Sequence, residues 1–227
     1  MTERTASRPQ DAPARPRRRD AQRNRDAIVA AARVAFAEKG LEASLEGIAR
    51  EAGVAIGTLY RHFPTRLALV DELFAEKFAY LLDAAEASAV MDDTWEGFCS
   101  FLERFCELQA CDRAFNALAG ARLPARTNSG QMNERAKELA CTILQRAQQQ
   151  GAVRADVTRE DMAFVAWSME GIIQATSVVA PRAWRRHLYL LLDAFRAECA
   201  HELPEPPLSP QQVAQTIDAL ECCVEDC

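Results

Sequence analysis

Apolar residues recur at helical spacing along most of this 227-residue chain, and no segment shows the alternating pattern of a half-buried strand. Ile28, Ala32, Ala35 and Phe36 fall at positions i, i+4, i+7 and i+8, which places them on one face of a helix. The same spacing continues from Leu67 through the aromatic-rich centre of the chain to its end. The sequence therefore predicts an all-α fold.

Residues that begin or end helices separate these apolar stripes. Gly40 and Gly151 each follow a stripe and are expected to end a helix, the second running from about residue 131 to 150. Pro181 is expected in the first turn of a late helix that continues through Phe195. Side chains with a hydrogen-bonding oxygen precede the other helices and are expected to cap them: Ser44, Thr65, Asp92 or Asp93, Asp112, Thr158 paired with Asp161, and Ser209.

The charge is divided unevenly along the chain. The formal net charge is −6, which taken alone argues against a nucleic-acid partner. However, residues 1–66 hold 13 basic and 8 acidic side chains, a net +5, whereas residues 67–227 hold 14 and 25, a net −11. Such asymmetry indicates that one end of the chain meets nucleic acid or a membrane. Residues 1–20 are rich in Arg and Pro with almost nothing apolar, which predicts a disordered basic arm.

No segment of the sequence is expected to cross a membrane, and no motif indicates a metal or a cofactor. The N-terminus has no apolar run typical of a signal peptide, and the apolar residues 163–180 carry Glu170 and Gln174 near their middle, so a buried helix is expected there. We therefore expect a cytoplasmic protein with no membrane partner. The eight cysteines form no CxxC motif and the three histidines do not have zinc spacing, so no zinc site is expected. Most thiols are expected to be buried. The alternative is a redox role for the cysteines of the tail, Cys222, Cys223 and Cys227.

Residues 44–63 have the pattern of a helix, a glycine turn and a second helix. Two short helices joined by a turn that contains Gly are typical of a helix-turn-helix, and Gly53 permits the positive φ that such a turn needs. With Leu59 and Phe63 directed inward, outward positions remain at Gly57, Thr58, Arg61 and His62. Arg61 could donate two hydrogen bonds to guanine, and hydroxyl or cationic side chains nearby could bind phosphates: Thr58, Tyr60, His62 and Arg66.

The same residues also have a purely structural interpretation. Two helices joined by a turn with exposed polar residues are common in proteins that bind no DNA. Tyr60 could be half-buried with its hydroxyl satisfied, and His62 could cap or pack against its own helix.

The run Ile48-Ala49-Arg50-Glu51-Ala52-Gly53-Val54-Ala55-Ile56-Gly57-Thr58-Leu59-Tyr60-Arg61-His62-Phe63 closely resembles the DNA-binding signature of the tetracycline-repressor family of bacterial transcription regulators. Ala35-Phe36, Gly40 and Ser44 fall where that family has its first helix and the cap of its second. The resemblance covers roughly residues 24–73, under a quarter of the chain.

The resemblance implies a homodimer with a three-helix DNA-binding head and a C-terminal helical bundle for ligand binding and dimerisation. The expected division is a basic arm at 1–20, a helix-turn-helix domain at 21–68, a ligand and dimer domain at 69–203, and a C-terminal link with a terminal helix at 204–227. Carried over by position, the residues expected to bind phosphates are Ser44, Thr58, Tyr60, His62 and Arg66. The residues expected to face the bases are Ile56, Gly57 and Arg61.

Two positions depart from the family pattern. Ala55 replaces the Ser or Thr that commonly caps the recognition helix, so that cap is missing at a cost of about 0.5–2 kcal/mol. Arg66 stands where a Lys is usual, which keeps the charge but changes its geometry.

Within the C-terminal domain the resemblance implies a small-molecule pocket and a dimer interface. The candidate pocket residues are aromatic and apolar, which indicates a hydrophobic ligand: Trp95, Phe98, Phe101, Phe105, Phe115, Trp167 and Met169. Helices that are apolar on more than one side need two partners, one of which could be a second subunit. The candidate interface residues are Phe164, Gly171, Val178, Trp184, Leu188, Leu191 and Phe195.

The sequence thus predicts a DNA-binding repressor that a small hydrophobic ligand releases from a palindromic operator. No catalytic motif is present, so an enzyme is not expected. Two alternatives remain open: a DNA-binding thiol sensor, and a helical scaffold that binds proteins and not DNA.

Overall fold

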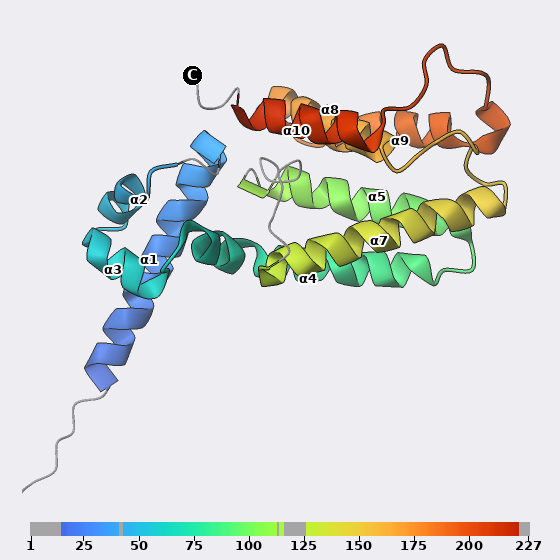
Figure 1. Cartoon of the computed structure of the whole chain (residues 1–227). Coiled ribbons are helices and arrows are strands. Elements are labelled where there is room, and N and C mark those ends of the chain that lie inside the picture. Colours follow the sequence, from blue (N-terminus) through green and yellow to red (C-terminus); the bar gives the residue numbers. More distant parts are fainter. Residues whose placement is uncertain (1–14, 41–42, 113, 116–125, 223–227) are drawn as a thin grey trace, which may run out of the picture.

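A computed structural model describes residues 15–40, 43–112, 114–115 and 126–222 (Figure 1). Within these residues the chain forms helices and loops, with one isolated β-bridge between Val153 and Arg196, so the expected all-α fold is confirmed. The helices are α1 (Arg15–Lys39), α2 (Leu45–Glu51), α3 (Ile56–His62), α4 (Arg66–Ala89), α5 (Thr94–Cys111), α7 (Asn128–Gln149), α8 (Asp161–Thr176), α9 (Ala183–Phe195) and α10 (Pro210–Cys222), with a 3-10 turn at Ala197–Cys199.

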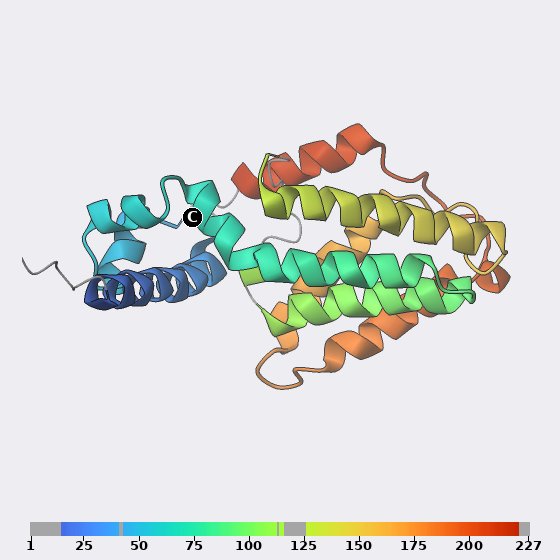
Figure 2. The ribbon, with the colours of Figure 1, turned by 90° about the horizontal axis from the view of Figure 1, so that it is seen from below.

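The helices fall into two groups, which we call the head (α1, α2 and α3) and the body (α5 and the helices that follow it). The head lies at one end of the molecule in both views, and α4 runs from it into the body (Figures 1 and 2). In the body, α4 packs on α7 and α5, while α5 also contacts α8 and α9. None of the described helices combines the length and the apolarity that crossing a membrane requires.

The long helix α4 belongs to both groups. It contacts α1 in the head as well as α5 and α7 in the body. Its buried side chains run from Leu69 to Ala85, and one continuous hydrophobic core extends from Ile28 of α1 to Leu192 of α9. The domain boundary expected at residues 68 and 69 therefore falls inside the first turn of α4.

The predicted helix ends agree well with the structure. Gly40, Gly53 and Gly151 have φ of 63°, 67° and 70°, the left-handed conformation that favours glycine. Four predicted caps accept a backbone N–H from the residue three positions on, at 3.0–3.2 Å: Ser44, Thr65, Asp93 and Ser209. The helix expected after Asp112 is described only at its start, and its continuation to Leu118 lies outside the described residues.

Several boundaries differ from the expectation. α1 begins at Arg15, so residues 15–20 are helical and not part of a disordered arm, because Arg is a good helix former and α1 contains no proline after Pro16. Residues 1–14 of that expected arm lie outside the described residues. α7 begins at Asn128, three residues early, with Thr127 as its cap. α9 begins at Ala183, so Pro181 lies in the turn before the helix and not in its first turn.

The pair Thr158 and Asp161 forms half of the expected capping box. The Asp161 carboxylate accepts from the backbone N–H of Thr158 at 2.7 Å and from its hydroxyl at 3.1 Å. The Thr158 hydroxyl is therefore a donor, and α8 begins at Asp161 with no side-chain cap.

Candidate nucleic-acid interface

Helices α2 and α3 form the helix-turn-helix that the glycine turn predicts. Leu45, Ile48 and Ala49 of α2 are buried, and Leu59 of α3 is fully buried at 0% exposure. At the turn, the backbone N–H of Val54 donates to the carbonyl of Ala49 at 3.0 Å, while Gly53 has positive φ. These contacts hold α3 at a fixed angle on α2 and leave the opposite face of α3 open.

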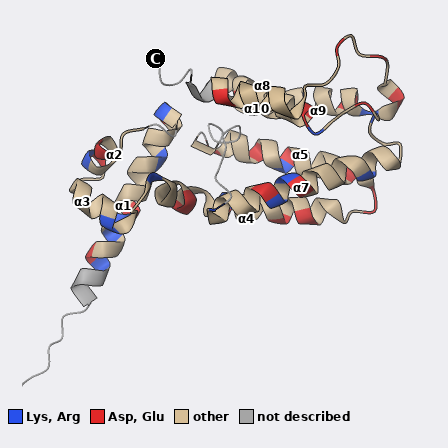
Figure 3. Cartoon of the chain, in the orientation of Figure 1, with Lys and Arg blue, Asp and Glu red and all other residues tan. Residues whose placement is uncertain are grey.

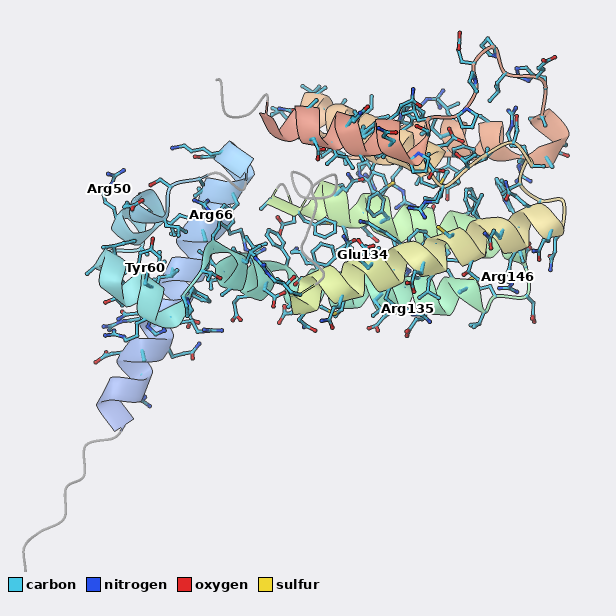
Figure 4. All side chains as sticks on the ribbon, in the orientation of Figure 1. Arg50, Tyr60, Arg66, Glu134, Arg135 and Arg146 are labelled. Atoms are coloured by element: carbon cyan, nitrogen blue, oxygen red, sulfur yellow. The ribbon has the colours of Figure 1, made fainter. Side chains whose placement is uncertain are left out.

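The open face of α3 consists of residues at positions i, i+1, i+4 and i+5. Ile56 is 37% exposed and Tyr60 is 45% exposed, although apolar and aromatic side chains of this size are usually covered. Gly57 and Arg61 are exposed beside them, and a Cβ added at Gly57 would meet nothing within 4 Å. Four predicted DNA-binding residues thus share one surface, with Thr58 half-buried at its edge. Tyr60 is labelled in Figure 4.

Ser44 is exposed, but its hydroxyl is already engaged. It accepts from the backbone N–H of Gly47 at 3.2 Å and donates to Glu46 at 3.0 Å. The backbone and Ser44 hydrogen bonds hold the pKa of Glu46 below its ordinary value, so a carboxylate stands beside the hydroxyl. The structural role of Ser44 is therefore the cap of α2.

Two predicted phosphate contacts are turned inward. The Nε2 atom of His62 is enclosed and has no hydrogen-bond partner, and its ring lies 6.5 Å from that of Phe63. Arg66 is half-buried and its Nη1 donates to the carbonyl of Ala43 at 2.6 Å, which ties the start of α4 to the start of α2. The structure does not bring these two side chains to the open face of α3, because packing and the backbone carbonyl engage them first.

The first turn of α3 has no side-chain cap, as the alanine at its start predicts. Ala55 has the extended φ and ψ of a cap residue (−67° and 145°), yet no side-chain oxygen reaches the free backbone N–H groups of α3. The seven residues of α3 are consequently held by tertiary packing through Leu59 and by the turn.

No sequence motif identified Arg25 of α1, whose side chain links α1 to the end of α3 and to α4. Its guanidinium lies 4.8 Å from the centre of the Phe63 ring, and its Nη2 lies 2.6 Å from the carboxylate of Glu72 in α4. Because Phe63 is the residue that ends α3, Arg25 places α1 directly beside the end of that helix. Basic side chains are prominent along α1, whereas acidic ones are spread over the body (Figure 3).

A second ionic contact, also missed in the sequence, joins head and body. The carboxylate of Asp112, which follows α5, is 7% exposed; its Oδ2 atom lies 2.6 Å from Arg33 of α1 and 2.8 Å from Lys77 of α4. Its Oδ1 atom accepts from the backbone N–H groups of Ala114 and Phe115 at 2.9 and 3.1 Å. One carboxylate thus binds three segments of the chain.

Several of the aromatic residues expected to line a ligand pocket pack against other aromatic rings. Phe98 and Phe195 meet edge to face at 5.8 Å, and Phe115 packs on Phe78 at 5.3 Å. Phe98, Phe101, Phe115 and Met169 are buried, while Trp95, Phe105 and Trp167 are half-buried. Six of the seven therefore belong to the core or pack against it, whereas Trp167 meets the exposed Phe164 edge to face. Helical spacing alone does not distinguish a core position from a pocket position. An open hollow lies elsewhere, on the outer face of α9, lined by Arg185, Arg186, Tyr189, Leu190 and Asp193.

The expected dimer residues divide into two groups. Phe164, Gly171 and Val178 are exposed, Val178 at 93%, whereas Trp184 and Leu188 are buried within this chain. Leu191 and Phe195 pack partly against the core. Other exposed apolar side chains lie on or near α8 and α9. We refer to the exposed set as the α8–α9 face and define it as Phe164, Gly171, Val178, Val179, Tyr189 and Leu190.

The described thiols differ in their accessibility. Burial raises the pKa of both Cys99 and Cys106 to about 12, which disfavours the thiolate at neutral pH. Cys111 and Cys199 are exposed. In the described part of the chain, no group of three or more His, Cys, Asp or Glu side chains could hold a metal ion.

An exposed, partly apolar helix face presented by a helix-turn-helix is the arrangement with which DNA-binding proteins of this class enter the major groove. The model for bacterial regulatory proteins of the tetR family matches residues 28–73, and the model for the SbtR-like transcriptional regulator C-terminal domain matches residues 93–197. The TetR transcriptional regulator SCO0520 from Streptomyces coelicolor is 33% identical over 76% of this chain and 98% of its own, with a TM-score of 0.45.

More distant structures share the fold. The ketosteroid regulator KstR2 of Mycobacterium tuberculosis is 19% identical over 76% of this chain and 94% of its own, with a TM-score of 0.60. FadR from Bacillus subtilis, solved in complex with stearoyl-CoA, is 20% identical over 78% of this chain and 99% of its own, with a TM-score of 0.57. The chain belongs to the TetR family and is a DNA-binding transcriptional regulator.

Proposed function

We propose that this regulator is a repressor that binds an inverted-repeat operator as a homodimer and leaves it when a small hydrophobic molecule binds the body. The observation that carries the proposal is the open face of α3, where Ile56, Gly57, Tyr60 and Arg61 are exposed together. A helix presenting these residues fits the major groove, where each base pair offers a distinct set of donors, acceptors and methyl groups.

Each residue of that face has a distinct role in the proposal. Arg61 donates two hydrogen bonds to a guanine edge, and Ile56 contacts a thymine methyl group. Gly57 lets the backbone approach the base pairs closely, since it has no side chain. Tyr60 and Thr58 donate to phosphates and fix the register. Arg66 and His62 support the head from inside and do not contact DNA themselves.

The α8–α9 face is the proposed dimer interface. Its members are exposed in the single chain, where the space over Gly171 is open. Because glycine has no side chain, Gly171 would allow two α8 helices to approach closely. A two-fold dimer would present its two α3 helices to successive major grooves about 34–36 Å apart. An inverted-repeat operator follows from that symmetry.

The proposed effector is apolar. The body holds an apolar core to which α5, α8 and α9 contribute, including the Phe98–Phe195 pair, and a ligand could bind there only if these side chains moved apart. An apolar effector is supported by FadR from Bacillus subtilis, a protein of similar fold that was solved in complex with stearoyl-CoA. Ligand binding would shift the dimer toward a geometry that no longer matches the operator. The free energy of this shift cannot exceed the difference between the ligand's binding free energies for the two dimer geometries.

Selection of binding sites from random duplex DNA by the full-length protein tests this function. We expect a single inverted repeat with one helical turn between half-site centres. Recovery of no preferred sequence, at low as well as physiological salt, would overturn the proposal and favour a scaffold that binds proteins.

A further inference from the structure

The outer side of α9 carries four exposed residues in a row along the helix. Arg186, Tyr189, Leu190 and Asp193 fall at positions i, i+3, i+4 and i+7, which are neighbours on one side of a helix. Tyr189 is 51% exposed and Leu190 is 58% exposed, and all four residues line the open hollow on this side of α9. Figure 2 shows α9 along the edge of the body opposite α10. We call these four residues the α9 stripe.

The order of charges in the α9 stripe is symmetric about its centre. Arg186 and Asp193 each lie about 5 Å along the helix from the midpoint between Tyr189 and Leu190, in opposite directions. The stripe therefore begins with a cation, has two large apolar side chains in its middle, and ends with an anion. A second copy of the helix running in the opposite direction presents an anion wherever the first has a cation.

Neither charge of the α9 stripe is well satisfied within the chain. Arg186 and Asp193 are two helical turns apart, about 10 Å, which is too far for them to pair with each other. In the part of the chain that the structure describes, no ion pair engages Arg186, whereas Arg185 beside it lies 3.7 Å from Glu103. Asp193 lies 3.8 Å from the Nε atom of Arg196, and its side chain is 73% exposed. Both charges are thus available to a partner.

We propose that two copies of α9 cross antiparallel at the middle of the α9 stripe, so that Arg186 of each subunit pairs with Asp193 of the partner subunit. The inference rests on the proposed homodimer through the α8–α9 face and adds the register of that interface and the residues that select the partner. In an interface between two identical chains around a two-fold axis, each such pair occurs twice. Tyr189 and Leu190 pack between the two pairs.

The antiparallel direction follows from the charges. A parallel crossing would set Arg186 against its own copy at one end and Asp193 against its own copy at the other, and like charges facing each other are unfavourable. Helices in contact lie about 8–10 Å apart, a gap that an Arg and an Asp side chain reaching toward one another can close. A free anion is a poorer occupant, because Asp193 repels it and it leaves both apolar side chains in water.

The consequence is selectivity for a second copy of this chain. A protein of the same fold with other residues at these four positions would leave Arg186 and Asp193 unpaired or place like charges beside them. Apolar side chains such as Leu190 stabilise the contact, whereas the two ion pairs determine which chain can make it.

The test exchanges the charges in the full-length protein. Each of the variants R186E and D193R is expected to dimerise at least about tenfold more weakly than the wild type in analytical ultracentrifugation, because both ion pairs become like-charge contacts. A 1:1 mixture of the two variants should recover the dimer, because the acidic stripe of one then meets the basic stripe of the other. Native mass spectrometry, with a longer tag on one variant, should find one subunit of each kind. The double variant R186E/D193R should dimerise by itself.

The control variants R135E and D83R make the same charge changes at exposed positions of α7 and α4, and each should dimerise like the wild type. Circular dichroism verifies that every variant is folded. Single variants that dimerise as tightly as the wild type, when F164E/L190E is monomeric, would overturn the ion pairs and leave the α8–α9 face as the interface. Single variants that are monomeric and stay so in the mixture would overturn the antiparallel register. A wild type that is monomeric when it binds the operator would instead overturn the proposed homodimer.

Discussion

Arg33 of α1 and Asp112 at the end of α5 lie 79 positions apart in the sequence, yet the guanidinium of one meets the carboxylate of the other at 2.6 Å. Lys77 of α4 adds a second cation at 2.8 Å from the same oxygen. Because Arg33 belongs to the head and Asp112 to the body, this contact fixes the two parts relative to one another. A change in the body that moves Asp112 would release a constraint on α1.

Replacing Asp112 with Asn tests the strength of this link. The variant leaves two cations close together without the carboxylate, so we expect the free energy of unfolding to fall by about 2 kcal/mol. Chemical denaturation followed by circular dichroism provides the measurement. Asp83→Asn, at an exposed position of α4, is the matched control and should leave stability unchanged. An unaltered free energy in the Asp112 variant would contradict the role assigned to the pair.

The same pair predicts a pH dependence. Burial raises the pKa of Asp112, but the hydrogen bonds from Lys77 and the Phe115 N–H, with the charges of Lys77 and Arg33, hold it below its ordinary value overall. The carboxylate therefore stabilises the folded state fully above the unfolded pKa of about 3.9, and this stabilisation is lost as the pH falls through the folded pKa.

Urea unfolding of the wild type and Asp112→Asn across pH measures this difference. The gap in free energy of unfolding should stay constant from about pH 7 to 5 and shrink below about pH 4. A gap that widens on acidification would mean that the folded pKa of Asp112 is raised.

Arg61 should determine sequence preference. We expect Arg61→Ala to weaken binding to the selected operator by about 10–100-fold, because a bidentate contact with guanine discriminates by about 1–3 kcal/mol. Binding to random duplex should change little, as measured by fluorescence anisotropy. Arg135→Ala, in α7 of the body (Figure 4), is the control of equal charge. Equal losses of affinity for operator and random DNA would mean that Arg61 contacts a phosphate and not a base.

Arg66 is expected to support DNA binding by stabilising the head and not by contacting DNA. Arg66→Gln removes the 2.6 Å hydrogen bond to Ala43, so the melting temperature should fall by about 2–4 °C for each kcal/mol lost. Any loss of DNA affinity should accompany that fall, and Arg66→Lys should recover part of it. Weakened DNA binding with an unchanged melting temperature would support a direct phosphate contact instead.

The α8–α9 face should control the oligomeric state. The double variant F164E/L190E places two charges on that surface without touching the core of the chain, and analytical ultracentrifugation should then find a monomer that remains helical. Val90→Glu, at an exposed apolar position after α4, is the control and should remain a dimer. Dimers that persist in the double variant would place the interface elsewhere.

Thiol reactivity distinguishes the effector-binding regulator from a thiol sensor. With iodoacetamide at pH 8, mass spectrometry should find Cys111 and Cys199 modified in the folded protein, and Cys99 and Cys106 unmodified, because their pKa of about 12 leaves almost no thiolate. All four should react in denaturant. Rapid modification of Cys106 in the folded state would contradict its burial and revive the sensor interpretation.

Local features were well predicted from the sequence, because each depends on residues close together in the chain. The positive φ of Gly53, the caps at Thr65 and Ser209 and the missing cap at Ala55 all follow from one residue type at one position. The open face of α3 follows from the spacing of its inward side chains.

Features that depend on distant residues could not be predicted in this way. Asp112 was expected only as a helix cap, since nothing in its neighbourhood indicates Arg33 or Lys77. Periodicity placed Trp184 and Leu188 on an apolar stripe, but whether such a stripe faces the core or a partner depends on what packs beside it. Arg66 was interpreted from its charge, whereas the carbonyl it binds is 23 positions earlier.

The passage of α4 through both parts of the molecule limits how the protein can be recombined. A chimaera joined at residue 68 would cut the helix in its first turn and exchange the surroundings of Leu69, Val70 and Leu73, which are all buried. Such a hybrid needs a donor whose own α4 fills the same space. Joining the two parts beyond Ala89, where the helix has ended, would instead exchange α5 and α7, the helices of the body on which α4 packs. Neither junction leaves the surroundings of α4 intact, so the whole chain acts as one structural unit in such an exchange.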